Sequence, residues 1–527
     1  MNARPRSPRT GAIFFALVAF AITIAGCRSP HGEGRAIRPL SIQDSRGLRS
    51  VEATTDNAPV PIFGVQSDPP APGAATLDLD SVLAGVEERF PLILAARAEL
   101  EMAEGRYLAS LGSFDTKFSA KALLEPQGNF EKEVVDVGFS QPLATAGINL
   151  FGGYRIGTGD FASYEGKAKT NDNGELRIGA TINLLQGREI DPRRVAQWKA
   201  QLDIERVTPE IEGKLLATRL KAGMAFWTWL EAGLLLDIAE RQVRLAEGRQ
   251  ASIEEAVQEG ELAPIAATDN ERTIVDRRAK SLAAQRKLEK AAIYLSLFVR
   301  DEEGRPVVPT RSQLPQAFPE PTDPVVLVEP DVEARALESR PEPRALSIEL
   351  NQLELETQLA ENQRMARLDA SVFVSQDYGS AANSPDDKDE LDVIAKVAFE
   401  LPIQRRKPRG KLRELQGKLA KRLAEMEFVE NSIVGEVRDA RSALERSWER
   451  IAQASRNVEL ARTLDSAERL LMDEGQSDLF RVNLREQQTA TAESALVRSL
   501  AEFHEAHIRF RAVTAELSPP GADALDR

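Results

Sequence analysis

Histidine is scarce in this chain, and two of the three histidines share a helix face. His504 and His507 are three residues apart, a spacing that suits a metal ion, while His31 lies far away in the sequence. A third ligand of the required kind is not evident near the pair. Solvated helix surface is therefore the favoured interpretation, and we predict neither a metal nor another cofactor.

The sequence contains no pattern typical of catalysis. Serine and histidine form no recognisable nucleophile motif, a phosphate-binding loop is missing, and carboxylates are scattered too evenly for an acid/base pair to stand out. The 82 acidic against 68 basic residues give a net charge of -14, which argues against nucleic acid as the main partner. We therefore do not expect an enzyme.

The single cysteine, Cys27, follows a signal-like segment. One cysteine excludes an internal disulfide framework and a multi-cysteine metal site. Residues 1–26 begin with three arginines, continue with an apolar stretch at 11–25 and end in small residues. This order is typical of a signal peptide that directs export.

Residues 24–27, Ile-Ala-Gly-Cys, resemble a bacterial lipobox. The resemblance implies acylation of Cys27, and two or three acyl chains anchor a protein stably where one would not. Arg28 follows, in place of the aspartate that resembles an inner-membrane retention signal, so the outer membrane is the expected destination. The alternative is an ordinary secretory signal with an incidental cysteine.

Two proline-rich stretches divide the rest of the chain. Residues 27–75 are expected to form a disordered tether, and residues 304–330 a linker between two halves. The halves, 76–303 and 331–516, look like internal structural repeats, and 517–527 form a C-terminal tail.

Each half is expected to open with a helix and continue with strands. The opening helices run from Phe90 to about Leu111 and over roughly 333–367. Polar and apolar residues then alternate over 115–122, 177–184 and 391–401, a period of two. Such strands have one wet and one apolar face, the pattern of a barrel wall with lipid outside and water inside. The polar segments between the strands, 160–174 and 379–390, are expected to be exposed loops.

A very long helix is expected after each set of strands. Apolar residues recur about every 3.5 residues over 408–473, the period of a coiled coil. At 1.5 Å per residue this helix would be roughly 100 Å long. A break at Glu474-Gly475 precedes a return helix at 478–514.

The first half follows the same plan less regularly. Its long helix is expected over 192–258, its break at Glu259-Gly260 and its return helix over 264–299. Pro209 should kink or restart the long helix, because proline cannot donate the helical hydrogen bond.

These lengths predict the architecture of an assembly. In each half one long helix would pack against two shorter ones stacked end to end, with strands at one end and a glycine turn at the other. Four to six strands per chain cannot close a wide barrel, whereas three chains would supply roughly 12 to 18 strands. The fold class is thus mainly α, with a β-barrel portion completed by neighbouring copies.

This ordered set resembles the TolC-like outer-membrane efflux protein family over nearly all of residues 76–516. The likeness is carried by Ala-Leu-Glu-Ser-Arg-Pro-Glu at 336–342, Phe-Ser-Gln-Pro-Leu at 139–143 and the turn beginning Glu474-Gly475. The resemblance implies a homotrimer with a transmembrane β-barrel and a periplasmic tunnel of coiled-coil helical hairpins. It also implies docking to a periplasmic adaptor and an inner-membrane transporter.

The two glycine turns are candidate docking sites. The resemblance assigns the periplasmic entrance and the adaptor-docking tips to Glu259, Gly260, Glu474 and Gly475. A plain helix break that needs a glycine is an equally open interpretation.

Charged residues beyond the turns are candidates for an entrance gate. Family members often carry acids there, whereas this chain has Arg481 where an acid is expected, Asp269 at the equivalent place in the first half, and Asp478 near the tip. A ring of such charges repeated by symmetry sets ion preference. We hypothesise a contact between Asp269 and Arg481; the alternative is ordinary helix surface.

Basic clusters open both long helices. Arg405, Arg406 and Lys407 follow a strand in the second half, and Arg193 and Arg194 stand at the corresponding place in the first, after a capping Asp191-Pro192. Contact with anionic lipid headgroups and a simple solvated helix start are both open.

The function favoured by the sequence is passive conduction through an outer-membrane channel of a tripartite efflux or type I secretion system. The alternative is a periplasmic coiled-coil lipoprotein acting as a scaffold or adaptor. Alternating strands at corresponding places in both halves argue against that alternative.

Overall fold

The computed structural model describes residues 76–517 apart from 163–167, 329, 381–387 and 389. The predicted signal peptide, Cys27, the tether and His31 lie outside the described residues. None of the helices in the described part combines the length and apolar character needed to cross a membrane.

The first half begins with two helices and four strands. Helices α2 (Leu79–Arg89) and α3 (Pro91–Leu111) lead through a 3-10 turn, η2 (Gly112–Phe114), into the sheet. The four strands are β1 (Lys117–Glu125), β2 (Lys132–Pro142), β3 (Ile148–Gly159) and β4 (Glu175–Asn183). The long helix α4 (Pro192–Gln258) and the return helix α5 (Ile265–Leu295) follow.

The second half has the same order of elements with fewer strands. A connection containing the short helices η4 (Arg311–Gln313) and α6 (Pro324–Leu327) leads to α7 (Val332–Ser339) and α8 (Pro341–Asn362). Two strands follow, β5 (Arg367–Asp377) and β6 (Asp392–Glu400). The long helix α9 (Arg406–Asp473) and the return helix α10 (Leu479–Val513) complete the half. Both long helices lie within two residues of their predicted positions.

Proline divides the opening helix of the second half. We expected one helix over roughly 333–367, but Arg340 adopts an extended conformation (ψ 137°) and separates α7 from α8. The residue before a proline is pushed out of the helical region, and Pro341 is well suited to the first helical position. Pro91 starts α3 in the same way.

Pro209 does not interrupt α4. The helix is continuous from Pro192 to Gln258, so the expected restart at this proline is wrong. Pro209 is buried, and contacts of α4 with its neighbours offset the missing backbone hydrogen bond. The predicted start is confirmed: Asp191 caps the helix by accepting from the backbone N–H groups of Arg193 and Arg194 at 2.8 and 3.2 Å.

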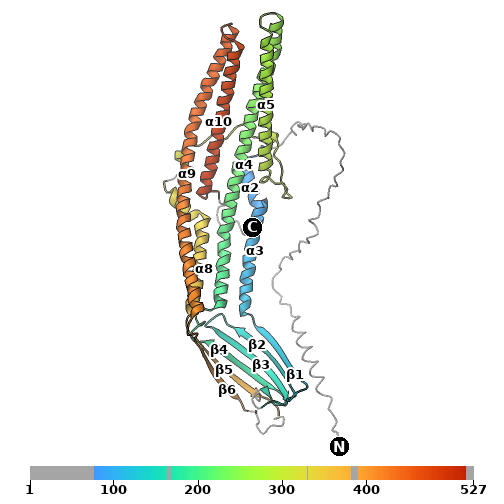
Figure 1. Cartoon of the computed structure of the whole chain (residues 1–527), viewed down its shortest axis with the longest axis vertical. Helices are drawn as coiled ribbons and strands as arrows, with labels where there is room; N and C mark the ends of the chain where they lie inside the picture. Colours follow the sequence, from blue (N-terminus) through green and yellow to red (C-terminus); the bar gives the residue numbers. More distant parts are fainter. Residues whose placement is uncertain (1–75, 163–167, 329, 381–387, 389, 518–527) are drawn as a thin grey trace, which may run out of the picture. The chain divides into compact units, whose positions relative to one another are not determined.

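Each long helix packs against shorter ones, as predicted. Helix α4 contacts α2, α3 and α5, and α9 contacts α7, α8 and α10; α4 also contacts α8 and α10, which joins the halves. Figure 1 shows the strands at one end of these helices and the α4–α5 and α9–α10 turns at the other. The largest apolar cluster contains Trp229 and Leu230 of α4 together with Val86 of α2, Leu295 of α5 and Ile508 of α10.

The interpretation of His504 as solvated surface is wrong. Its side chain is 6% exposed, its ring centroid lies 4.5 Å from that of Trp227, and Nε2 lies 3.2 Å from the carbonyl oxygen of Pro319. Burial lowers the pKa of His504 to about 4, so the ring is neutral at pH 7. Among the described residues, no group of three or more acidic, histidine or cysteine side chains has an arrangement that suits a metal ion.

All six strands form one antiparallel sheet in sequential order. The strands of the two halves meet where β4 pairs with β5, with Ile178 opposite Val374. In the described residues the first half contributes four strands to this sheet and the second half two. The sheet thus joins segments more than 180 residues apart in the chain.

Candidate functional site: sheet faces and helical turns

One face of the sheet exposes its large apolar side chains. Paired residues lie on the same face, as with Phe118 and Phe139, Ile178 and Val374, and Leu368 and Phe399. The exposed large apolar residues of this face are Phe118, Leu124, Phe139, Leu150, Leu176, Ile178, Val372, Val393, Val397 and Phe399. Soluble monomers rarely expose so continuous an apolar surface, which marks contact with a membrane or a partner.

The opposite face carries almost all of the charged strand residues. Its basic residues are Lys117, Lys121, Lys132, Arg155, Arg177, Arg367 and Lys396, and its acidic residues are Glu125, Asp136, Glu175, Asp369, Asp377, Asp392 and Glu400. The apolar face has one charged strand residue, Glu133. Seven cations against seven anions give this polar face no excess of either sign.

Ion pairs and small residues organise the polar face. Oδ2 of Asp136 accepts hydrogen bonds from Arg155 Nη2 at 2.5 Å and Arg177 Nη2 at 2.8 Å, which ties β2, β3 and β4 together. Phe373 packs across Gly179, where an added Cβ would lie 2.3 Å from the Cβ of Phe373. Lys396 Nζ lies 4.8 Å from the centre of the Phe373 ring. Charged and small side chains thus predominate on the face opposite the apolar side chains, although Leu123 is exposed there as well.

The sheet has two open edges, β1 and β6. Every residue of β1 is exposed except Glu125, and every residue of β6 is exposed except Ile394. Among the residues that the structure describes, no further strand pairs with the outer N–H and C=O groups of β1 and β6. Such edges pair readily with another strand, and proteins normally cover or pair them.

The two helical turns have the same hydrogen-bond pattern. Gly260 N–H donates to Val257 O at 3.2 Å and Glu261 N–H to Ala256 O at 2.9 Å. At the other turn, Gly475 N–H donates to Met472 O at 2.9 Å and Gln476 N–H to Leu471 O at 2.8 Å. These pairs define a Schellman motif, which needs positive φ at the glycine; φ is +79° at Gly260 and +75° at Gly475.

The turns expose polar and apolar side chains together. The capping residues Glu259 and Glu474 are exposed, as are the glycines. Just beyond the turns, Ile265 is 71% and Phe480 70% exposed. Large apolar side chains at an exposed helix tip are typical of a surface that contacts another protein.

The predicted gate residues lie on different helices of one chain. Asp269 on α5 pairs with Arg272, Oδ1 to Nε 3.5 Å. Asp478 is the N-cap of α10 and accepts from the backbone N–H of Arg481 at 2.9 Å, so its carboxylate helps to start that helix. Contact between Asp269 and Arg481 stays a prediction.

Sequence reasoning missed a buried carboxylate near the turns. Glu486 on α10 is 2% exposed, and its Oε2 accepts from Arg249 Nη2 of α4 at 2.5 Å and from Arg277 Nη2 of α5 at 3.0 Å. Its Oε1 accepts from Arg469 Nη2 of α9 at 3.0 Å. We call these four residues the Glu486 cluster. Glu486 stands four residues after the buried Val482 and therefore lies on the same, inward face of α10. This spacing is the one feature of the sequence that could have predicted its burial.

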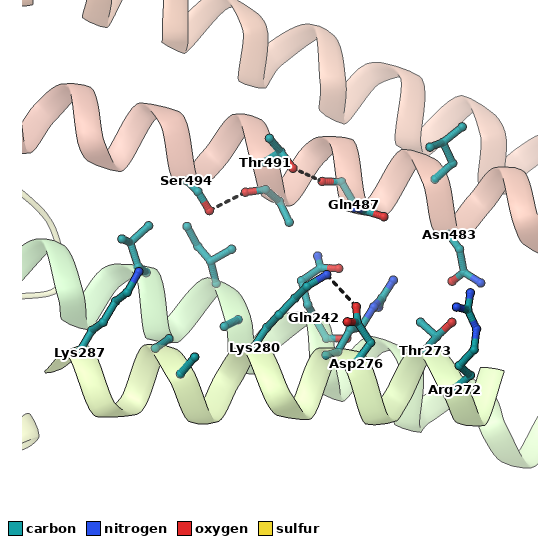
Figure 2. A pocket seen from close by; sticks show the side chains of 18 of the residues that line it. Gln242, Arg272, Thr273, Asp276, Lys280, Lys287, Asn483, Gln487, Thr491 and Ser494 are labelled. Atoms are coloured by element: carbon teal, nitrogen blue, oxygen red, sulfur yellow. Dashed lines mark hydrogen bonds and ion pairs between the residues drawn. The ribbon is translucent and has the colours of Figure 1, made fainter. Parts of the chain in front are cut away.

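A groove lined by both polar and apolar side chains lies between α5 and α10 beside this cluster. It has a volume of about 630 Å³ and is lined by side chains of α4, α5 and α10. Figure 2 shows Gln487, Thr491 and Ser494 on one side of it and Asp276 and Lys280 on the other. Its charged lining residues are Arg272, Arg277, Lys280, Lys287, Arg498, Asp269 and Asp276, so basic groups predominate.

The basic clusters at the helix starts differ in exposure. Arg194 is buried, and its guanidinium donates to Asp191 Oδ2 at 2.6 Å and to the carbonyl oxygens of Gly187 and Arg188 at 2.9 and 2.8 Å. These bonds hold the junction of sheet and helix and leave Arg194 little surface for a headgroup. Arg193 is exposed on the same turn.

The second cluster has a different backbone geometry. Arg405 adopts a left-handed conformation, with φ +50°, immediately before α9. It is half-buried, whereas Arg406 and Lys407 are exposed. Arg406 and Lys407 are therefore free to contact an anionic surface, whereas the buried Arg194 is not.

Comparison with solved structures gives the same fold for several outer-membrane channels. The outer-membrane channel OprN aligns with a TM-score of 0.61 and 15% identity, covering 83% of this chain and 89% of that chain. VceC from Vibrio cholerae gives 0.60 and 13%, covering 83% and 95%, and CmeC from Campylobacter jejuni gives 0.58 and 11%, covering 84% and 87%. Neither a protein-family model nor a curated protein matches the sequence. The predicted resemblance is thus confirmed in the fold, which is that of TolC-like outer-membrane channels.

Proposed function

We propose that this chain is the outer-membrane channel of a tripartite efflux or type I secretion system. Three copies form a duct that conducts substrates passively from a periplasmic adaptor and an inner-membrane transporter to the exterior. Acylation of Cys27 anchors each copy in the outer membrane. Two repeats, 76–303 and 331–516, joined by a linker at 304–330, provide the wall of the duct.

The two-faced sheet is the observation that carries this proposal. Side chains such as Val393 and Val397, 66% and 71% exposed, suit contact with lipid, while the opposite face carries balanced charges that suit water. A periplasmic scaffold has no need of a sheet with its apolar face outward. The likeness in fold to outer-membrane channels supports the same function.

The helical turns are proposed to dock the adaptor. Gly260 and Gly475 shape two similar tips, and Glu259, Glu474, Ile265 and Phe480 are exposed there. The apolar side chains supply contact area that is desolvated on binding, and the glutamates add charged groups at the rim.

The entrance is proposed to be held shut by charged contacts near the tips. The Glu486 cluster joins four helices of one copy. Asp269, Asp478 and Arg481 lie on the exposed side of the return helices, where contacts between copies would form. Opening then requires these ion pairs to separate or to move together.

The exposed residues Arg193, Arg406 and Lys407, with Arg405 beside them, are proposed to contact lipid headgroups. They follow directly on strands β4 and β6, at the level where the sheet ends. Basic side chains near an anionic surface contribute about 1 kcal/mol each.

Planar-bilayer recording on the full-length protein, purified from membranes in detergent, tests the proposal. We expect heat-modifiable trimers in the outer-membrane fraction and discrete single-channel conductance. A strain lacking the protein should also regain susceptibility to exported toxic compounds when its pump is intact. A monomeric protein without conductance that still binds neighbouring envelope proteins would favour the scaffold function and overturn the channel.

A further inference from the structure

Two phenylalanine rings lie on the polar face of the sheet, the face proposed to line the duct. Phe151 of β3 and Phe373 of β5 are both paired with Gly179 of β4, from its two sides. We propose that these rings and the neighbouring Lys396 form a binding site for small aromatic anions, such as aryl carboxylates and sulfonates. This inference rests on the proposed conducting function and specifies a class of solute that the channel binds.

The strand register places the rings in one row across the sheet. On β6, Ile394 lies directly opposite Phe373. Directly paired residues point to the same face, and residues two apart along a strand do as well, so these apolar side chains share the face of Lys396. An apolar row therefore extends from β3 to β6 on a surface that otherwise carries mainly charged and small side chains.

Gly179 lets the two rings approach each other. The ring centroids of Phe151 and Phe373 are 6.1 Å apart, and the ring planes are tilted by 57°. Aromatic side chains about 4.5–7 Å apart attract each other and form a joint surface. Both side chains are half-buried, so part of this surface remains accessible to a solute.

Covering the glycine explains one ring but not two. An aromatic side chain over a glycine is a known way to stabilise a sheet. On the apolar face Phe139 covers Gly152, where an added Cβ would lie 2.7 Å from Phe139 Cε1. At Gly179 the atoms nearest to an added Cβ belong to Phe373 and the backbone of Val372. Phe151 is therefore an additional ring, and it supplies the second half of the aromatic surface.

The next row of side chains on this face is polar. It consists of Asn149, Thr181, Ser371 and Lys396, paired in that order across β3 to β6. The hydroxyl oxygens of Thr181 and Ser371 are 3.0 Å apart, so one hydroxyl donates to the other and the second hydroxyl can donate to a ligand. Asn149 Oδ1 accepts from Ser140 Oγ at 3.0 Å, which leaves the amide nitrogen as a donor.

Lys396 supplies the positive charge of the site. Its side chain is exposed, and Nζ lies 4.8 Å from the centre of the Phe373 ring. In the part of the chain that the structure describes, no carboxylate forms an ion pair with this ammonium group. Asp369, on the neighbouring strand, is bound by Arg367 at 2.6 Å. The acids of β6 are each four residues away, about 13 Å along the strand. The ammonium group is therefore available to an anion.

The two rows together select the chemistry of the ligand. They lie two residues apart along the strands, about 6.6 Å, which an aryl carboxylate or sulfonate of one or two rings can span. The ring of such a solute stacks on Phe151 and Phe373, while its anionic group accepts hydrogen bonds from Lys396 and the adjacent hydroxyl and amide groups. An aliphatic anion lacks the stacking contact, and Lys396 repels an aromatic cation.

Equilibrium dialysis of the full-length protein in detergent tests the site, with protein-free detergent micelles in the reference chamber. The probe is 2-naphthalenesulfonate. Methanesulfonate is the comparison anion without a ring, and 2-naphthylmethylammonium is the comparison ring with a positive charge. We expect the dissociation constant of the probe to be at least tenfold lower than that of either comparison ion. Conductance of the same preparation in planar bilayers is recorded in parallel.

Substitutions on the two faces separate binding from sheet structure. Phe151→Leu and Phe373→Leu each remove a ring but retain an apolar side chain, and Lys396→Gln removes the charge. The matched controls are Phe139→Leu, which removes a ring that covers a glycine on the apolar face, and Lys121→Gln, which removes an exposed cation elsewhere on the polar face. We expect each of the first three variants to raise the dissociation constant of 2-naphthalenesulfonate at least fivefold, and the controls to change it less than twofold.

Several outcomes would overturn the site. Equal losses of binding in Phe139→Leu and Phe373→Leu would show that the rings act only on the structure of the sheet. Equal binding of methanesulfonate would overturn the role of the rings, and equal binding of 2-naphthylmethylammonium that of Lys396. Because Lys396 is exposed, its variant keeps the test available if loss of a ring prevents folding. Conducting protein that does not bind the probe would overturn the site and leave the channel function standing. Absence of conductance in the wild type would instead count against the proposed function.

Discussion

The six-stranded sheet and the helices bury opposite kinds of side chain. Val397 in β6 is 71% exposed, whereas Trp229 in α4 is fully buried and the charged Glu486 is buried with three arginines. In the sheet, apolar groups face outward because the proposed surroundings are lipid. In the helices, apolar groups face inward and the few buried charges are paired. The contrast indicates that the two regions are built for different solvents.

A lysine on the apolar face of the sheet should have the largest effect. Val372→Lys places a charge where lipid is proposed, at a cost of about 2–4 kcal/mol. Ser371→Lys is the matched control, because Ser371 is adjacent to Val372 in β5 and its side chain points to the opposite, polar face. Heat-modifiable trimers in the outer-membrane fraction should fall steeply for Val372→Lys alone. Equal assembly of both variants would contradict the assignment of the faces.

The Glu486 cluster should give the next largest effect. Glu486→Gln keeps the size of the side chain but leaves the arginines without their shared charge, and should lower stability by about 2–3 kcal/mol. Glu459→Gln, which removes an exposed partner of Arg456, should change it by less than about 0.5 kcal/mol. Urea unfolding followed by circular dichroism measures both. We also expect more frequent channel opening in Glu486→Gln; a stability loss as small as that of the control would refute the role of the cluster.

The pH dependence of stability should report the burial of His504. Its folded pKa of about 4 lies below the ordinary value of 6.5, so the unfolded chain binds the extra proton first as pH falls. The free energy of unfolding is highest above pH 6.5, where His504 is neutral in both states, and it decreases as pH falls toward 4. At pH 5 this group should have lowered the free energy of unfolding by about 2 kcal/mol. The melting temperature of His504→Phe should therefore fall less between pH 7 and pH 5 than that of the wild type. If the melting temperatures of the two proteins fell equally between pH 7 and pH 5, His504 would not be the titrating group.

The turn glycines should give the smallest effect. Gly475→Ala forces a Cβ into a left-handed conformation and should destabilise the α9–α10 turn by about 1 kcal/mol. Gly435→Ala, in the open interior of α9, should stabilise the protein by up to about 1 kcal/mol. Melting temperatures should thus move in opposite directions. A shift of the same sign in both variants would contradict the requirement for glycine at the turn.

Local patterns were sufficient to predict the long helices, their turns and some of the strands, but not β3, β5 or the division of α7 from α8. The period of two over 391–401 predicted β6 and its two faces, and the period near 3.5 over 408–473 predicted α9 to within two residues. Gly260 and Gly475 marked the ends of both long helices correctly. These patterns depend only on the spacing of residues along one strand or one helix, and that spacing can be read directly from the sequence.

Contacts between distant segments were decided only by the tertiary structure. Pairing of β4 with β5 unites six strands in one sheet, Glu486 gathers arginines from three other helices, and His504 is covered by Trp227 and Phe318. The periodicity of a helix or strand identifies an inward face but not the groups that will meet it. The sequence by itself therefore determined where the long helices, their turns and some of the strands lie, while the packing of separate elements determined which charged and aromatic side chains they bury.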